Sequence, residues 1–92
     1  MSDETTHPHL TWRHEVRMRL PEGRRLLALS LMAKEIARGK HVWWNTGGYS
    51  VFAFADKALR DRFEAEAVDV VNGPELSWDQ VVLRVDKVRL AR

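Results

Sequence analysis

Residues 41–54 read His-Val-Trp-Trp-Asn-Thr-Gly-Gly-Tyr-Ser-Val-Phe-Ala-Phe, two aromatic-rich runs on either side of a glycine pair. β-Branched and aromatic residues favour strands. A type I′ turn, which joins antiparallel strands through two residues, needs a positive φ at both of them, and glycine adopts that conformation without strain. The stretch therefore predicts a β-hairpin that turns at Gly47-Gly48.

The turn also predicts which side chains share a face of the sheet, because successive side chains along a strand point to opposite faces. If Phe52 faces the core, a two-residue turn places its cross-strand neighbour Trp43 on the core face. Trp44 and Tyr49 then lie on the opposite, open face. A three-residue loop would reverse this assignment.

Upstream of the hairpin, residues 11–20 alternate between two sets of side chains. One set is mainly apolar: Trp12, His14, Val16, Met18 and Leu20. The other is polar or charged: Thr11, Arg13, Glu15, Arg17 and Arg19. A period of two over ten residues predicts a strand with one buried face and one solvated face. The preceding residues are polar, so we expect a flexible tail at residues 1–10 and a single α+β domain over residues 11–92.

Helical spacing appears on both sides of the hairpin. An apolar stripe predicts a helix that ends near Arg38, where Gly39 is suited to the left-handed residue after a helix. Its members are Leu26, Leu29, Met32, Ala33, Ile36 and Ala37. After the hairpin, Asp56 is a suitable N-cap for a helix from Lys57 to about Val68.

The last segment, residues 77–90, fits two structures. Ser77 and Gln80 resemble a capping box, and the apolar residues from Trp78 onward keep helical spacing. Against this, the valines at 81, 82 and 85 are β-branched and favour a strand. We expect a strand over residues 81–90. The order then describes a ferredoxin-like βαββαβ sandwich, a four-stranded antiparallel sheet with two helices on one face. The alternative is a three-stranded sheet with a C-terminal third helix.

The first predicted helix carries two leucines outside its apolar stripe. Leu27 and Leu31 lie one turn apart among basic residues, which is typical of a helix that contacts a partner. This candidate partner-binding set comprises Arg24, Leu27, Leu31, Lys34 and Arg38. Two alternatives stay open: the leucines are scattered exposed residues without a binding role, or they are covered by the N-terminal tail or by the C-terminal segment.

The open face of the predicted sheet is a second candidate surface. It combines Arg13, Arg17 and Arg19 with Trp44 and Tyr49, and such a face binds single-stranded nucleic acid by stacking and by phosphate contacts. Residues 48–54 resemble the aromatic signature on the third strand of the RNA-recognition motif family. The resemblance covers about seven residues and implies a stacking role only for Tyr49, because Val51 replaces an aromatic residue and Gly47 a basic one.

Catalytic and metal chemistry lack a recognisable motif. The chain has no cysteine, its four histidines have no zinc-ligand spacing, and its serines have no neighbouring base. We therefore expect no enzymatic activity, no cofactor and no metal. The absence of cysteine and of a long apolar segment suits a cytoplasmic protein that does not enter membranes.

The charge distribution adds one further indication. Residues 56–79 carry seven acidic and three basic side chains, whereas the last thirteen residues carry four basic and one acidic. Such asymmetry predicts a surface of two signs. The leading hypothesis is a small protein-binding module, an adaptor, regulator or inhibitor that binds another protein or itself. The alternative is a single-stranded nucleic-acid-binding protein.

Overall fold

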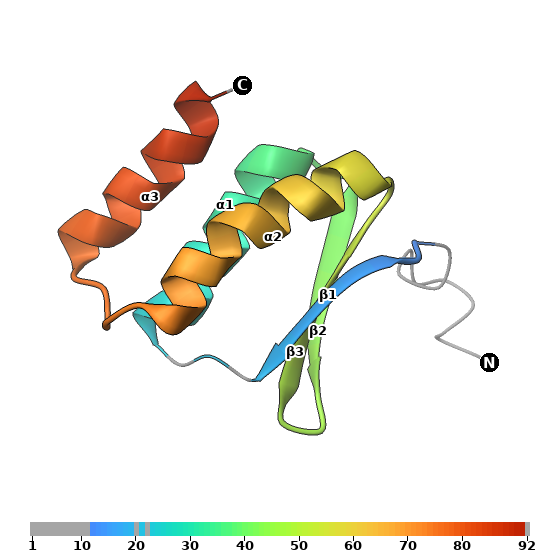
Figure 1. The fold of residues 1–92 in the computed structure, drawn as a ribbon, viewed down its shortest axis with the longest axis horizontal. Helices are drawn as coiled ribbons and strands as arrows, with labels where there is room; N and C mark the ends of the chain where they lie inside the picture. Colours follow the sequence, from blue (N-terminus) through green and yellow to red (C-terminus); the bar gives the residue numbers. More distant parts are fainter. Residues whose placement is uncertain (1–11, 20, 22, 92) are drawn as a thin grey trace.

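The computed structural model describes residues 12–19, 21 and 23–91. The predicted tail at residues 1–10 lies outside this range. The described chain forms β1 (His14–Arg19), α1 (Arg24–Ala37), β2 (His41–Thr46), β3 (Tyr49–Phe54), α2 (Lys57–Asn72) and α3 (Trp78–Leu90). Figure 1 shows three layers: the sheet, the pair α1 and α2, and then α3 on the side away from the sheet.

The sheet is antiparallel with the strand order β1-β3-β2, so the hairpin strand β3 is central. Gly47 and Gly48 have φ values of 55° and 83°, as the predicted turn requires. Trp43 pairs with Phe52 and Trp44 with Val51. This register confirms the expected face assignment, since Trp43 stacks on Phe52 with ring centroids 5.6 Å apart.

Helices α1 and α2 cover one face of the sheet. Three phenylalanine rings join the layers: Phe63 of α2 lies 4.7 Å from Phe52 and 5.2 Å from Phe54, centroid to centroid. Leu29 and Met32 of α1 are fully buried in the same cluster. The predicted α1 ends as expected, with Arg38 and Gly39 both at positive φ. The second helix runs four residues further than predicted, to Asn72.

The expected strand over residues 81–90 is wrong, and with it the four-stranded ferredoxin-like sheet. The segment is helix α3, so the chain takes the stated alternative, a three-stranded antiparallel sheet with a third helix at the C-terminus. The capping box of Ser77 and Gln80 is present at its start. Val81, Val85 and Val88 are buried, which is a spacing of four and three residues. A helical face therefore buries the same valines that a strand would have distributed over two faces.

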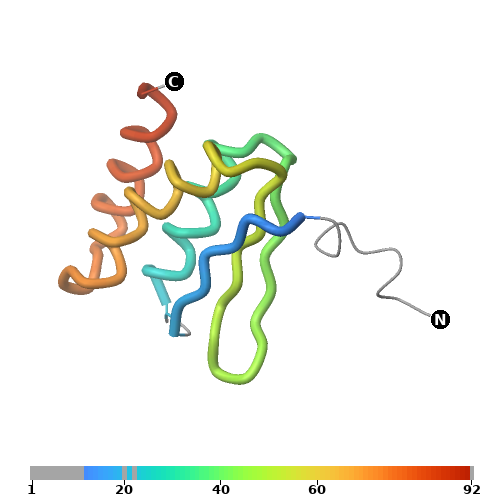
Figure 2. The backbone as a smooth tube through the Cα atoms, turned by 45° about the vertical axis from the view of Figure 1, so that its right-hand side comes forward, coloured from blue at the N-terminus to red at the C-terminus, as the bar shows by residue number. Residues whose placement is uncertain are grey.

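Two consecutive arginines attach the linker before α3 to the start of α1. Arg24 donates to the carbonyl of Leu76 at 3.1 Å, and Arg25 donates to the carbonyl of Gly73 at 2.6 Å. Arg62 of α2 donates to the carbonyl of Val88 at 2.8 Å. These bonds hold α3 over both α1 and α2 (Figure 2). None of the helices in the described residues is long and apolar enough to cross a membrane.

Candidate functional site

Leu31 lies beside α3. Leu27 lies one turn earlier on α1, between Leu31 and Arg24, and Arg24 contacts Trp78 at the start of α3. Leu31 is half-buried and lines a shallow groove of about 170 Å³ with Val82 and other residues of α3. Leu27 is 37% exposed, Val82 is 57% exposed and Trp78 is 59% exposed. We call this surface, made of Leu27, Leu31, Trp78 and Val82, the α1–α3 seam.

The sequence predicted the two α1 residues of the seam but not its two α3 residues. The C-terminal segment covers Leu31 in part, which was one of the stated alternatives, and leaves Leu27 open to solvent. Trp78 and Val82 were not in the predicted set. They stand four residues apart, one turn along α3, and that spacing was the signal that could have found them.

The basic residues of the predicted set have different environments. The guanidinium of Arg24 lies 4.9 Å from the centroid of the Trp78 ring, so this arginine holds the ring against α1. Lys34 and Arg38 are exposed near the C-terminal end of α1. No ion pair joins either of them to another residue that the structure describes. Lys34 and Arg38 therefore add positive charge next to the seam, beyond Leu31, where Asp86 and Arg89 also line the groove.

The sheet face opposite the helices carries most of the second predicted set. Cross-strand register places Arg17, Val51 and Trp44 in one row. Arg19, Tyr49 and Thr46 form the next row. Glu15 shares this face and lies 3.7 Å from Arg17, which reduces the positive charge there. Arg13 precedes β1 and is exposed beside the start of α2.

His41 is the most strongly desolvated histidine whose environment the structure resolves. Its ring stacks on Phe54 with centroids 6.0 Å apart, and its Nδ1 atom is buried without a hydrogen-bond partner. Burial lowers the pKa of His41 below its ordinary value of 6.5. The neutral form is thus favoured in the folded chain, because an imidazolium ion loses hydration when it is buried.

This shift predicts a pH dependence of stability. The unfolded chain takes up a proton near pH 6.5 and the folded chain only at lower pH. The contribution of neutral His41 to the free energy of unfolding is therefore complete above the pKa of the unfolded chain. It is lost as the pH falls from there toward the lower pKa of the folded chain. We expect His41→Phe to reduce the loss of melting temperature between about pH 7.5 and about pH 5. Trp43→Phe, at the neighbouring position on the same face of β2, changes no titratable group and is the matched control, so it should leave the loss unchanged; the reverse pattern contradicts this assignment.

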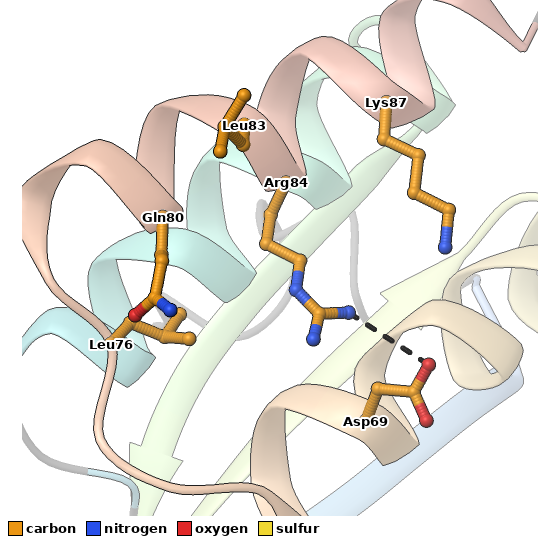
Figure 3. Close-up of a pocket in the computed structure, with 6 residues that line it drawn as sticks. All are labelled: Asp69, Leu76, Gln80, Leu83, Arg84 and Lys87. Atoms are coloured by element: carbon orange, nitrogen blue, oxygen red, sulfur yellow. Dashed lines mark ion pairs between the residues drawn. The ribbon is translucent and has the colours of Figure 1, made fainter.

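A groove of about 350 Å³ lies between α2 and α3. Figure 3 shows Arg84 reaching from α3 toward Asp69 of α2, and their charged atoms are 3.8 Å apart. Lys87 pairs in the same way with Glu66 at 3.4 Å. The acidic and basic segments of the sequence therefore partly neutralise each other across these two helices. We find no arrangement of a nucleophile and a base in this groove.

Another charged cluster lies on the first turns of α2. Lys57 and Arg60 bond Asp61 at 2.7 and 2.8 Å. The bonds from Lys57 and Arg60 lower the pKa of Asp61. These residues form a solvated ion-pair network, and a carboxylate held ionised in this way is a poor proton donor. Within the described residues, no three His, Asp or Glu side chains gather as a metal site would need.

Comparisons with protein-family models, with curated proteins and with solved structures each find no match to this chain.

Proposed function

We propose that this chain is a small, non-enzymatic protein-binding module that acts by occupying a partner's surface through the α1–α3 seam. The observation that carries the proposal is the exposure of Leu27, Trp78 and Val82 on two packed helices. Arg24 contacts Trp78 and Leu31 lines a groove with Val82, and Leu27 lies between Arg24 and Leu31 on α1. Exposed apolar side chains that gather in one place, rimmed by charge, are typical of binding surfaces, whereas scattered ones are not.

The composition of the seam supports a contact with protein. An aromatic anchor and aliphatic neighbours at the centre, with arginine and lysine at the edge, match the anatomy of protein interfaces. Lys34 and Arg38 extend from one end of the seam without an intramolecular ion pair among the described residues. They favour a partner whose apolar anchors are followed by acidic side chains.

The test compares two double variants of the full chain. Leu27→Asp with Val82→Asp places charge in the seam, and Val68→Asp with Leu90→Asp makes the same change at two exposed apolar residues elsewhere. We expect a partner captured from the native host by the wild-type chain to be lost by the seam variant, with at least a tenfold fall in affinity. The control variant should retain it. Circular dichroism must be the same for all three proteins.

Equal capture by the wild-type chain and the seam variant would contradict the proposal. A partner lost equally by both double variants would also contradict it, because the effect would then follow total charge and not the seam.

A second candidate function is the binding of single-stranded nucleic acid on the open sheet face. It is favoured by one observation, the alignment of Arg17 with Trp44 and of Arg19 with Tyr49 across the sheet. The neighbouring Glu15 and the small number of arginines weigh against it.

This candidate makes a distinct prediction. If it is correct, a labelled oligonucleotide of about a dozen bases binds less tightly as salt rises from about 50 to 200 mM. Trp44→Ala should then cost about 1–3 kcal/mol of binding free energy, the value of one base–aromatic stack. Trp43→Ala, on the opposite face, is the control and should have little effect. No binding at the lower salt concentration removes this candidate.

A further inference from the structure

The two edges of the sheet differ sharply in charge. The edge strand β1 carries Glu15, Arg17 and Arg19. The Nε atom of Arg60 also donates to the outward carbonyl of Glu15 at 3.2 Å, so α2 uses part of that edge. The other edge strand, β2, contains no Asp, Glu, Lys or Arg in its six residues.

Proteins usually protect an exposed strand edge with charged side chains, proline or a bulge, because unpaired backbone groups there bind further strands. Strand β2 has none of these. Its register with β3 follows from the two-residue turn, so Thr46, Trp44 and Val42 exchange backbone hydrogen bonds with β3. The backbone groups of His41, Trp43 and Asn45 then point away from the sheet. The Trp43 side chain is 37% exposed at this edge.

We propose that β2 pairs in an antiparallel arrangement with β2 of a second copy of this chain, about a two-fold axis at Trp43, and so joins the two sheets into one. In this arrangement Trp43 lies opposite Trp43 of the second copy. Val42 lies opposite Trp44, and His41 lies opposite Asn45. The Val42–Trp44 and His41–Asn45 pairs each occur twice, and the Trp43 pair occurs once, on the axis, as a two-fold interface requires.

The charges and shapes of the strand fit this pairing. An aromatic ring against a β-branched side chain is a favourable cross-strand pair, and Val42 with Trp44 forms it on the open face. No like charges meet along the strand, since all six residues are uncharged when His41 is neutral. Burial lowers the pKa of His41 and so favours its neutral form at neutral pH. Strand β1 would bring its three charged side chains into any such contact.

The proposed interface lies on the sheet, whereas the α1–α3 seam lies on the helical layers (Figure 1). The dimer therefore leaves the seam open and does not depend on the proposed function.

The test measures the mass of the full chain by sedimentation equilibrium from about 10 µM to about 1 mM. We expect twice the chain mass at the upper end. Trp43→Lys brings two ammonium groups together at the axis and should leave a monomer throughout. Tyr49→Lys is the matched control, because Tyr49 is exposed to a similar extent, 40%, but lies on the central strand. It should keep the dimer.

A second measurement needs no variant and covers the case in which Trp43→Lys fails to fold. Hydrogen exchange at the Trp43 amide should slow as the wild-type concentration rises, while exchange at the Arg17 amide, on the charged edge, stays constant. A wild-type monomer over the whole range would overturn the proposal. So would a dimer that persists in a folded Trp43→Lys variant, or one that is lost with Leu27→Asp and Val82→Asp.

Discussion

Phe63→Ala is expected to remove about 3–5 kcal/mol from the free energy of unfolding. The Phe63 side chain is fully buried, and its ring contacts the rings of Phe52 and Phe54 on the central strand. It is the aromatic link between α2 and the sheet. Alanine removes the ring and leaves a cavity that neighbouring side chains fill only in part. Since domains of this size are stable by about 5–15 kcal/mol, a large share of the total would be lost.

Urea denaturation followed by tryptophan fluorescence measures this loss. Tyr49→Ala is the control, because it removes an aromatic ring that is 40% exposed at the end of the hairpin. It should cost about 1 kcal/mol or less. A Phe63→Ala variant no less stable than Tyr49→Ala would mean that α2 is not anchored to the sheet through this ring.

Val85→Asp is expected to have an effect of similar size, about 3–5 kcal/mol or more, because it places an unpaired charge in a buried site. Val85 lies in the middle of α3, between the buried Val81 and Val88, and faces α1. Leu83→Asp is the matched control on the same helix. Leu83 is 65% exposed, so the same change there should alter stability by no more than about 0.5 kcal/mol.

Chemical denaturation of both variants tests the orientation of α3. If its attachment is lost before the rest of the chain unfolds, Val85→Asp should also make the linker before Trp78 sensitive to protease. Equal stability of the two aspartate variants would show that the valine face does not contact α1.

The sequence was sufficient to predict the hairpin and the face of the sheet on which each of its side chains lies. A turn of two glycines leaves one register, and that register determines that Trp43 and Phe52 share a face. It also identified α1, since six apolar residues at helical spacing have no other efficient way to be buried. It also predicted that Arg17, Arg19, Trp44 and Tyr49 share one face, which the register confirms. The binding roles of these residues and of Leu27 and Leu31 stay predictions.

The sequence did not identify Trp78 and Val82 as part of the seam. It also did not predict which charged side chains form contacts within the chain. Arg24 was predicted to bind a partner, yet it holds Trp78 and the Leu76 carbonyl. The acidic residues of α2 and the basic residues of α3 were predicted to form a surface of two signs, yet several pair with each other. Such contacts join residues far apart in the chain, and only the packed helices bring them together.

What the sequence by itself determined, therefore, were the elements with strong local signals: the strand β1, the glycine hairpin, and the helices α1 and α2. Only the tertiary structure decided the state of residues 78–90, because valines at 81, 85 and 88 suit one face of a helix while their side-chain branching suits a strand. Intrinsic preferences differ by less than about 1 kcal/mol per residue. The burial of three valines against the α1–α2 layer outweighs that difference. The same packing brings Val82 next to Leu31 and Trp78 next to Arg24, the residues on either side of Leu27, and so completes the seam.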